Sequence, residues 1–207
     1  GVGHQPGCVA GGGPWRAALR LLTCAMTDKT FISANDLLDD SYRLAHRILD
    51  AGFHPNYIVG IWRGGTPVGI AVQELLAFQG IPTDHIAIRT SSYDGIEDQR
   101  DQVLVHGLHY IIENVNAADS LLIVDDVFDS GRSVQAVIDA IGRLSRLNAP
   151  GDMRVATVYY KPNKRKVDLT PDFYLHETDN WLVFPHELHG LSDEEIAANK
   201  PLALRKD

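Results

Sequence analysis

Cysteine is scarce in this sequence, and both of its cysteines lie near the start. The 207 residues include only Cys8 and Cys24, so no disulfide framework holds the core, and a reducing cytoplasm is the expected compartment. No apolar run approaches the roughly 20 residues that cross a bilayer, which argues against a membrane partner. A net charge of −8 argues against a nucleic-acid partner, because such proteins neutralise phosphates with a basic surface. Any anionic ligand must therefore be held locally.

The rest of the composition is ordinary for a globular protein, with 44% hydrophobic and 22% charged residues, and the length fits one domain. The opening segment, residues 1–25, is rich in glycine, and its apolar stretch is too short for an export signal and is broken by Arg20. We expect residues 1–25 to be a disordered extension upstream of a start at Met26, with one domain over residues 26–207.

Helical and extended patterns alternate after Met26. Apolar spacing predicts a helix that is capped by Ser33 and stopped by Gly52, and Pro67 marks the first turn of a helix that reaches Phe78. The alternation predicts an α/β fold with a mostly parallel central sheet, helices on both faces and ligands beyond the carboxyl ends of the strands. Strands are expected over residues 57–61, 85–90, 121–124, 154–160, 172–175 and 181–184, and further helices over residues 133–147 and 192–199.

The segment LLIVDDVFDSGRS, residues 121–133, combines two features that a sugar phosphate requires. Asp125 and Asp126 are expected at the end of a buried strand, where they can accept hydrogen bonds from vicinal ribose hydroxyls while one supports a metal ion. A short Ser/Gly loop then enters a helix, so the backbone N–H groups of residues 130–133 can surround a phosphate with help from the helix dipole.

This segment resembles the phosphoribosyl pyrophosphate signature of the type I phosphoribosyltransferases, in which an acidic pair precedes a D-[ST]-G-x-[ST] loop. A receiver domain also has an acidic pair after a strand, but near its N-terminus and without the DSGRS loop. The resemblance implies that the domain is a phosphoribosyltransferase with a small C-terminal hood. It also implies that the following residues bind phosphoribosyl pyrophosphate: Asp125, Asp126, Asp129, Ser130, Gly131, Arg132 and Ser133.

Two further segments agree with the resemblance. Arg63-Gly64-Gly65 is similar to the pyrophosphate loop of the family, in which glycines let the backbone approach the ligand and the preceding peptide bond, here Trp62-Arg63, is often cis. Ser92-Tyr93 opens a long polar stretch, residues 91–108, and is similar to the mobile lid of the 6-oxopurine enzymes. Such a lid would exclude water from the reacting carbon. An exposed loop is the alternative for this stretch.

The carboxyl-terminal third indicates which base is transferred. Lys161 resembles the family lysine that donates to the purine O6, with a solvated strand-end lysine as the alternative. Trp181 corresponds to the aromatic residue that stacks on the purine, with core packing as the alternative, and the backbone of Leu182 and Val183 would meet the exocyclic edge. The combination is most like the bacterial hypoxanthine, guanine and xanthine enzymes of purine salvage.

The resemblance also implies a mechanism and a metal. Mg²⁺ would bridge the ribose hydroxyls and the pyrophosphate, with Asp125, Asp126 and Glu187 as the metal residues. Asp129 is the candidate catalytic residue, which transfers a proton at purine N7. His186-Glu187 stands where the family has an aromatic residue followed by aspartate, which puts the role of Glu187 in question.

Three other readings are set against this one. The histidine pairs His106/His109 and His186/His189 suggest zinc, but no cysteine accompanies them and surface positions are favoured. A phosphoribosyl-pyrophosphate-sensing regulator without catalysis would need a recognition module, which the sequence does not display. A transferase for another base is the third alternative. Family members are usually dimers or tetramers, so a homodimer or homotetramer is expected.

Overall fold

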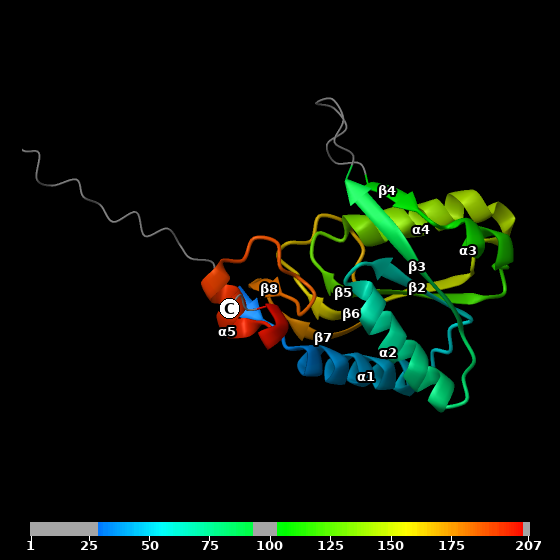
Figure 1. Cartoon of the computed structure of the whole chain (residues 1–207). Coiled ribbons are helices and arrows are strands. Elements are labelled where there is room, and N and C mark those ends of the chain that lie inside the picture. The colour runs from blue at the N-terminus through cyan, green and yellow to red at the C-terminus, as the bar shows by residue number, and fades with distance from the viewer. Residues whose placement is uncertain (1–28, 93–102, 205–207) are drawn as a thin grey trace, which may run out of the picture.

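The protein is described by a computed structural model over residues 29–92 and 103–204. Its body is a sheet covered by helices on both faces, and a smaller unit lies beside one end of the sheet (Figure 1). The strands are β1 (Lys29–Phe31), β2 (Tyr57–Trp62), β3 (Asp84–Ser92), β4 (Val103–His106), β5 (Ser120–Phe128), β6 (Asp152–Tyr160), β7 (Phe173–Glu177) and β8 (Trp181–Val183). The helices are α1 (Ala34–Asp50), α2 (Gly65–Phe78), α3 (His109–Asn114), α4 (Arg132–Ser145) and α5 (Asp193–Asn199), with 3₁₀ turns η1 (Arg146–Asn148) and η2 (Leu202–Leu204).

The main sheet has the strand order β4-β3-β2-β5-β6-β7, and every neighbouring pair is parallel except β3 and β4. Side chains of β5 alternate between two cores. Leu122 and Val124 face the core under α1 and α2, whereas Leu121 and Ile123 face the core under α3 and α4. All four are fully buried, which is why the strand reads as a continuous apolar run. The predicted fold class is confirmed.

Helix α1 begins and ends at the predicted signals. The Ser33 hydroxyl oxygen accepts a hydrogen bond from the backbone N–H of Asp36 at 3.1 Å, and so caps the first turn. Gly52 has a φ of +70°, and the N–H of Phe53 donates to the Ile48 carbonyl, which is the pattern of a Schellman motif. This turn points Phe53 into the core and sets the approach of β2.

The carboxyl half of β5 departs from the prediction. We expected the strand to end at Val124 with the acidic pair after it, but β5 runs to Phe128 and so contains Asp125 and Asp126. The cause is unequal pairing on its two sides. β2 leaves β5 after the pair Gly60–Val124, whereas β6 stays alongside β5 as far as Phe128. The acidic pair therefore lies where one edge of β5 is open.

The stretch predicted as one long polar loop is partly strand. β4 returns antiparallel to β3, with Ser91 opposite Leu104 and Ser92 opposite Val103. β4 is an edge strand of only four residues with alternating exposure, so its short apolar run did not stand out from the polar stretch around it. Helix α3 after it was also missed. Tyr93, the second residue of the predicted lid pair, lies outside the described residues.

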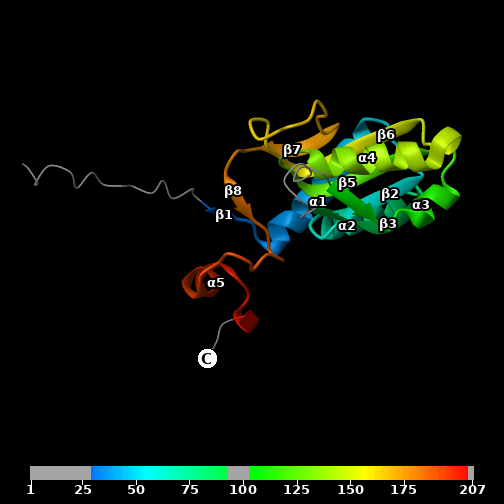
Figure 2. The ribbon, with the colours of Figure 1, turned by 90° about the horizontal axis from the view of Figure 1, so that it is seen from above.

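The smaller unit, here called the hood, is built from both ends of the described chain. β1 pairs in parallel with β8, and α5 lies beside them (Figure 2). The predicted small C-terminal hood is present, and β1, which was not predicted, is part of it. Strand β1 was missed because three residues are too few for a periodic signal. The consequence is that residues before α1 contact the segment that carries Trp181.

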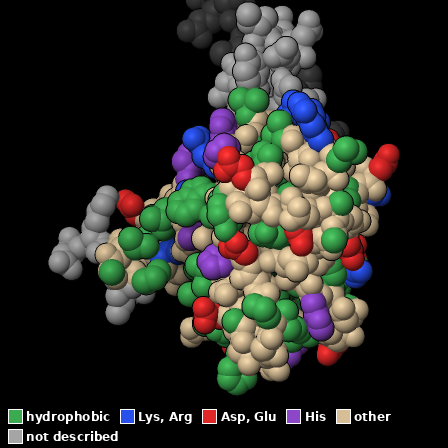
Figure 3. All heavy atoms as spheres, turned by 90° about the vertical axis from the view of Figure 1, so that its right-hand side faces the viewer, with side chains coloured by type: hydrophobic (Ala, Val, Ile, Leu, Met, Phe, Trp, Pro, Cys, Tyr) green, Lys and Arg blue, Asp and Glu red, His purple; other side chains and the backbone are tan. Residues whose placement is uncertain are grey.

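The opposite end of the sheet, where the strands begin, carries charged side chains of both signs scattered among uncharged ones (Figure 3). Helix α4 ends earlier than predicted, because Arg146 has a φ of +53° and the chain turns there into η1. No helix within residues 29–92 and 103–204 combines the length and the apolar character needed to span a membrane.

Candidate active site

The two glycines of the predicted pyrophosphate loop lie against the acidic pair. A Cβ on Gly65 would stand 2.2 Å from the Val124 carbonyl oxygen, and a Cβ on Gly64 would stand 2.1 Å from Oδ2 of Asp126. Only glycine permits this approach. The peptide bond between Trp62 and Arg63 is cis, as the resemblance implied. The open edge of β5 is thus filled by the start of α2.

The acidic pair is held in an environment that disfavours two negative charges. Asp126 is only 7% exposed, and its burial, followed by the negative charge of Glu187, raises its pKa to about 6. Burial and the neighbouring Asp126 charge raise the pKa of Asp125 well above its ordinary value. The Nε2 atom of His186 lies 3.5 Å from Oδ2 of Asp126, and burial lowers the pKa of this histidine. Hydrogen-bond donors or a cation would stabilise the charged pair.

The predicted phosphate loop lies at the N-terminus of α4. Gly131 is its N-cap with a φ of +76°, and a Cβ there would stand 2.5 Å from the Phe128 ring. The Ser130 hydroxyl accepts from the N–H of Arg132 at 3.4 Å, and the Ser130 carbonyl accepts from the N–H of Lys166 at 2.9 Å. The loop is therefore fixed from both sides, with the first N–H groups of α4 placed for an anion. Ser133 is the second residue of α4.

Lys161 and Asp129, which were assigned separately to the base, form an ion pair with 2.8 Å between Nζ and Oδ2. The Lys161 side chain is 9% exposed, so it is not the solvated strand-end lysine of the alternative reading. Its backbone N–H donates to the carbonyl of Phe128 at 2.9 Å, which fixes the end of β6 to the end of β5. The pair joins the two strand ends beside the phosphate loop.

A cavity of about 490 Å³ is bordered by this ion pair, by Asp126 of the acidic pair and by residues of the hood. Trp181 borders it and is 51% exposed, which excludes core packing as its role. Val127, Lys164 and Phe184 were not predicted as site residues, although Val127 lies within the segment of residues 121–133. The residues that line the cavity are Asp126, Val127, Asp129, Lys161, Lys164, Trp181, Leu182, Phe184 and Glu187.

A second cavity of about 250 Å³ adjoins the first, because Trp181 and Glu187 border both. Arg63 lines the second cavity and not the first. Val183 also lines the second cavity, and its carbonyl accepts from the N–H of Ile32 at 3.0 Å. The two residues whose backbone was predicted to contact the base therefore border different cavities. Leu182 lines the cavity that contains Lys161, and Val183 lines the second cavity.

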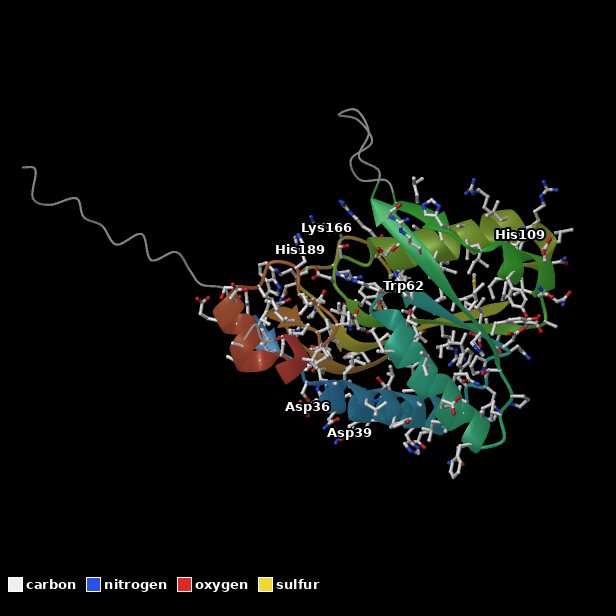
Figure 4. All side chains as sticks on the ribbon, viewed as in Figure 1. Asp36, Asp39, Trp62, His109, Lys166 and His189 are labelled. Atoms are coloured by element: carbon white, nitrogen blue, oxygen red, sulfur yellow. The ribbon has the colours of Figure 1, made fainter. Side chains whose placement is uncertain are left out.

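The predicted metal residues do not form a ligand cluster by themselves. Oε2 of Glu187 accepts from the backbone N–H of Phe184 at 3.0 Å. Across residues 29–92 and 103–204, no three or more His, Cys, Asp or Glu side chains are grouped to hold a metal ion. The two histidine pairs lie apart from each other, since His109 and His189 are at opposite ends of the molecule (Figure 4). His186, which the sequence singled out as a departure from the family pattern and as a member of a histidine pair, is the histidine that lies beside the acidic pair.

An acidic pair with glycines packed against it, followed along the chain by a Ser/Gly loop at a helix N-terminus, is the arrangement that the phosphoribosyl signature predicts. The sequence model of the phosphoribosyl transferase domain matches residues 33–190, and the chain belongs to that family. A xanthine-guanine phosphoribosyltransferase of Desulfotalea psychrophila (strain LSv54) is 32% identical over 157 residues, which cover 74% of this chain and 83% of that protein.

Two further comparisons extend the picture. The bifunctional protein PyrR of Corynebacterium diphtheriae is 27% identical over 122 residues, which cover 56% of this chain and 64% of that protein. A purine phosphoribosyltransferase from Pyrococcus horikoshii superposes with a TM-score of 0.61 at 22% identity, and the match covers 79% of this chain and 97% of that one. The last comparison shows the shared fold.

Proposed function

We propose that the protein joins a 6-oxopurine base, hypoxanthine, guanine or xanthine, to the ribose of phosphoribosyl pyrophosphate and releases pyrophosphate. The observation that carries the proposal is one cavity bordered by Asp126, by the Lys161–Asp129 pair and by the half-exposed Trp181. The residues assigned to the ribose and those assigned to the base would therefore border the same cavity. The xanthine-guanine relative supports the choice of a 6-oxopurine.

The sugar phosphate is assigned to the motifs at the strand ends. Asp125 and Asp126 accept hydrogen bonds from the ribose hydroxyls, which relieves the charge that burial and proximity disfavour. The loop at residues 129–133 binds the 5′-phosphate through N–H groups at the start of α4. Arg63, Gly64 and Gly65 bind the pyrophosphate. The leaving group then departs on the side of the second cavity, which Arg63 lines.

The base is assigned to the first cavity. Lys161 donates to O6, Asp129 faces N7 and exchanges a proton there, and Trp181 stacks on the ring. Purine N9 attacks ribose C1 with inversion while the bond to pyrophosphate breaks, so no protein nucleophile takes part. Because Lys161 and Asp129 already hold each other, the base would meet an oriented donor and an oriented acceptor.

The acidic pair fits a magnesium ion that takes most of its ligands from substrate and water, as Mg²⁺ usually does. The fit rests on the raised pKa of Asp126 and on the Gly64 approach, which leaves no room for a side chain beside that carboxyl. Asp125, Asp126 and Glu187 would support the ion without enclosing it. When bound, the ion neutralises charge on the departing pyrophosphate.

One assay tests the proposal. The purified protein is incubated with phosphoribosyl pyrophosphate, Mg²⁺ and each base in turn, and nucleotide and pyrophosphate are measured. Equal release of both with at least one 6-oxopurine is expected, and none without base. A phosphoribosyl-pyrophosphate-sensing regulator, the reading that the PyrR relative favours, would bind the sugar phosphate without turnover. Turnover with adenine, uracil or orotate alone would assign another base.

We also infer a homodimer or homotetramer that works in the cytoplasm. Two large apolar side chains, Trp62 on β2 and Ile70 on α2, are each 58% exposed and are candidates for a subunit contact. Light scattering coupled to size exclusion measures the mass of the assembly. A monomer at micromolar concentration would contradict the inference.

A further inference from the structure

Lys29 and Trp181 are direct partners across the parallel pair of strands in the hood. Partners on adjacent strands project from the same face of a sheet, so their side chains lie next to each other. The Lys29 Nζ atom stands over the indole at 5.7 Å from the ring centroid, which is within the range of a cation–π contact. Lys29 is not among the residues that line either cavity, whereas Trp181 borders both.

The Lys29 ammonium is fixed by the segment that follows the site. Its Nζ donates to Oε1 and Oε2 of Glu195 at 2.7 and 2.9 Å, and to the Gly190 carbonyl at 3.3 Å. Glu195 is itself fixed, because Oε2 accepts from the Ser192 N–H at 2.9 Å in the capping box of α5. The hydrogen bond from Lys29 lowers the pKa of Glu195, which favours the carboxylate form of Glu195.

A chain of contacts therefore runs from the capping box of α5 through Glu195 and Lys29 to the indole. Trp181 needs such support, because it is half exposed and lies at the first residue of a three-residue strand. A tryptophan side chain in that situation has rotamer freedom that a stacking ligand would have to restrict, and restriction lowers affinity. A cation held over the ring reduces that freedom before the ligand arrives.

We propose that Lys29, anchored by Glu195, is a positioning residue that sets the Trp181 ring for stacking on the base. The proposal rests on the proposed function, in which Trp181 stacks on the purine. It assigns a role in base affinity to both ends of the described chain, β1 and α5, although neither contributes a residue to the cavity with Lys161.

The first test removes the positive charge of Lys29 and keeps most of its aliphatic side chain. Lys29→Met should raise the KM for the base roughly two- to fivefold, the scale of one exposed cation–π contact, and leave the KM for phosphoribosyl pyrophosphate unchanged. Lys29→Arg, which retains the cation, should restore the base KM. Glu195→Gln is the matched variant, because glutamine preserves the capping box but removes the anionic anchor, and it should act in the same direction as Lys29→Met.

The second test shows whether the effect passes through the ring. Trp181→Leu removes the π face, so adding Lys29→Met to Trp181→Leu should change the base KM no further. Additive effects would overturn the proposal, as would an equal loss of affinity for base and sugar phosphate, which would mean that Lys29 only holds the hood together. Thermal unfolding of each variant separates that structural role from positioning.

A third readout needs no substrate. The difference in fluorescence between the wild type and Trp181→Leu isolates the emission of Trp181, and Lys29→Met should shift that emission in the free protein. If Trp181→Leu leaves base binding intact, the proposed stacking itself fails. If Trp181→Leu weakens the base but Lys29→Met changes neither the emission nor the base KM, the stacking stands and the positioning role of Lys29 is wrong.

Discussion

The ammonium of Lys161 lies 2.8 Å from the carboxylate of Asp129, and each residue directly follows one of two neighbouring parallel strands. The lysine is almost fully buried and the aspartate is half exposed. This asymmetry matters because loss of the aspartate would leave a buried cation without its counter-ion, whereas loss of the lysine would leave a carboxylate that water can solvate. Removal of the Asp129 charge should therefore cost more stability than removal of the Lys161 charge.

We predict that Asp129→Asn lowers kcat by about 10²-fold, the usual scale for one general acid–base group. The affinity for phosphoribosyl pyrophosphate should stay within a few-fold, because asparagine can still accept a hydrogen bond from Lys161 and the phosphate loop keeps its backbone contacts. Steady-state kinetics and calorimetric titration of the sugar phosphate measure the two quantities. Parallel losses in both would show that Asp129 only holds the phosphate loop.

We predict that Lys161→Met raises the KM for every accepted purine roughly 10- to 100-fold, because a charge-assisted hydrogen bond of about 1.5–3 kcal/mol to O6 is lost. The KM for the sugar phosphate should not change. Lys164→Met is the matched control, since Lys164 lines the same cavity but is not paired with Asp129 by any contact described above. An unchanged purine KM in Lys161→Met would remove Lys161 from base recognition.

A pH-dependent prediction follows from the burial of Asp126. Its pKa is raised from 3.8 to about 6 in the folded protein, so the folded state binds this proton more tightly than the unfolded chain. The contribution of Asp126 to the free energy of unfolding therefore falls as the pH rises from about 4 to about 6, and stays low above that. At neutral pH the free protein carries a penalty on the order of 3 kcal/mol from this carboxylate.

Asp126→Asn should remove that penalty and abolish activity. We expect the variant to unfold at a higher temperature than the wild type at pH 7 without ligands, and at a similar temperature near pH 4. Thermal unfolding across this range gives the difference directly. A difference that is equal at both pH values would mean that packing of the amide, and not the charge, is responsible.

Much of the fold was predictable because it depends on local patterns. The Ser33 cap, the Gly52 stop and the apolar run before Asp125 are signals that a few consecutive residues carry. What the sequence could not show depends on pairing between distant segments. The length of β5 follows from β6 staying paired where β2 leaves, and β1 exists only because β8 lies beside it.

The site was predicted in the same uneven way. The phosphate loop and the glycines were recognised from motifs, and the structure places the glycines against the acidic pair and the loop at the start of α4. The pairing of Lys161 with Asp129 was not foreseen, because the two residues were assigned to different atoms of the base. His186 had no motif, and only the folded chain brings it to 3.5 Å from Asp126. Contacts between side chains of separate motifs could not be predicted from the sequence, because they depend on how distant segments pack.

The last prediction separates the two glycines of the pyrophosphate loop. A Cβ on Gly65 would meet backbone atoms, the Val124 carbonyl oxygen at 2.2 Å and the Asp125 Cα at 2.9 Å, which cannot move without shifting β5. Gly65→Ala should therefore destabilise the protein by about 1–3 kcal/mol or more. A Cβ on Gly64 would meet the side chain of Asp126, which can rotate away.

Gly64→Ala should accordingly keep most of its stability and lose activity, because the displaced Asp126 carboxyl no longer faces the ribose site. Gly69→Ala is the matched control on the same helix, since its nearest neighbour would be Gly60 Cα at an ordinary 3.8 Å, and alanine favours the helix by up to about 1 kcal/mol. Denaturant unfolding and turnover of the three variants measure both effects. If Gly64→Ala kept full turnover, Asp126 would not need its present position, and its assignment to the ribose hydroxyls would be wrong.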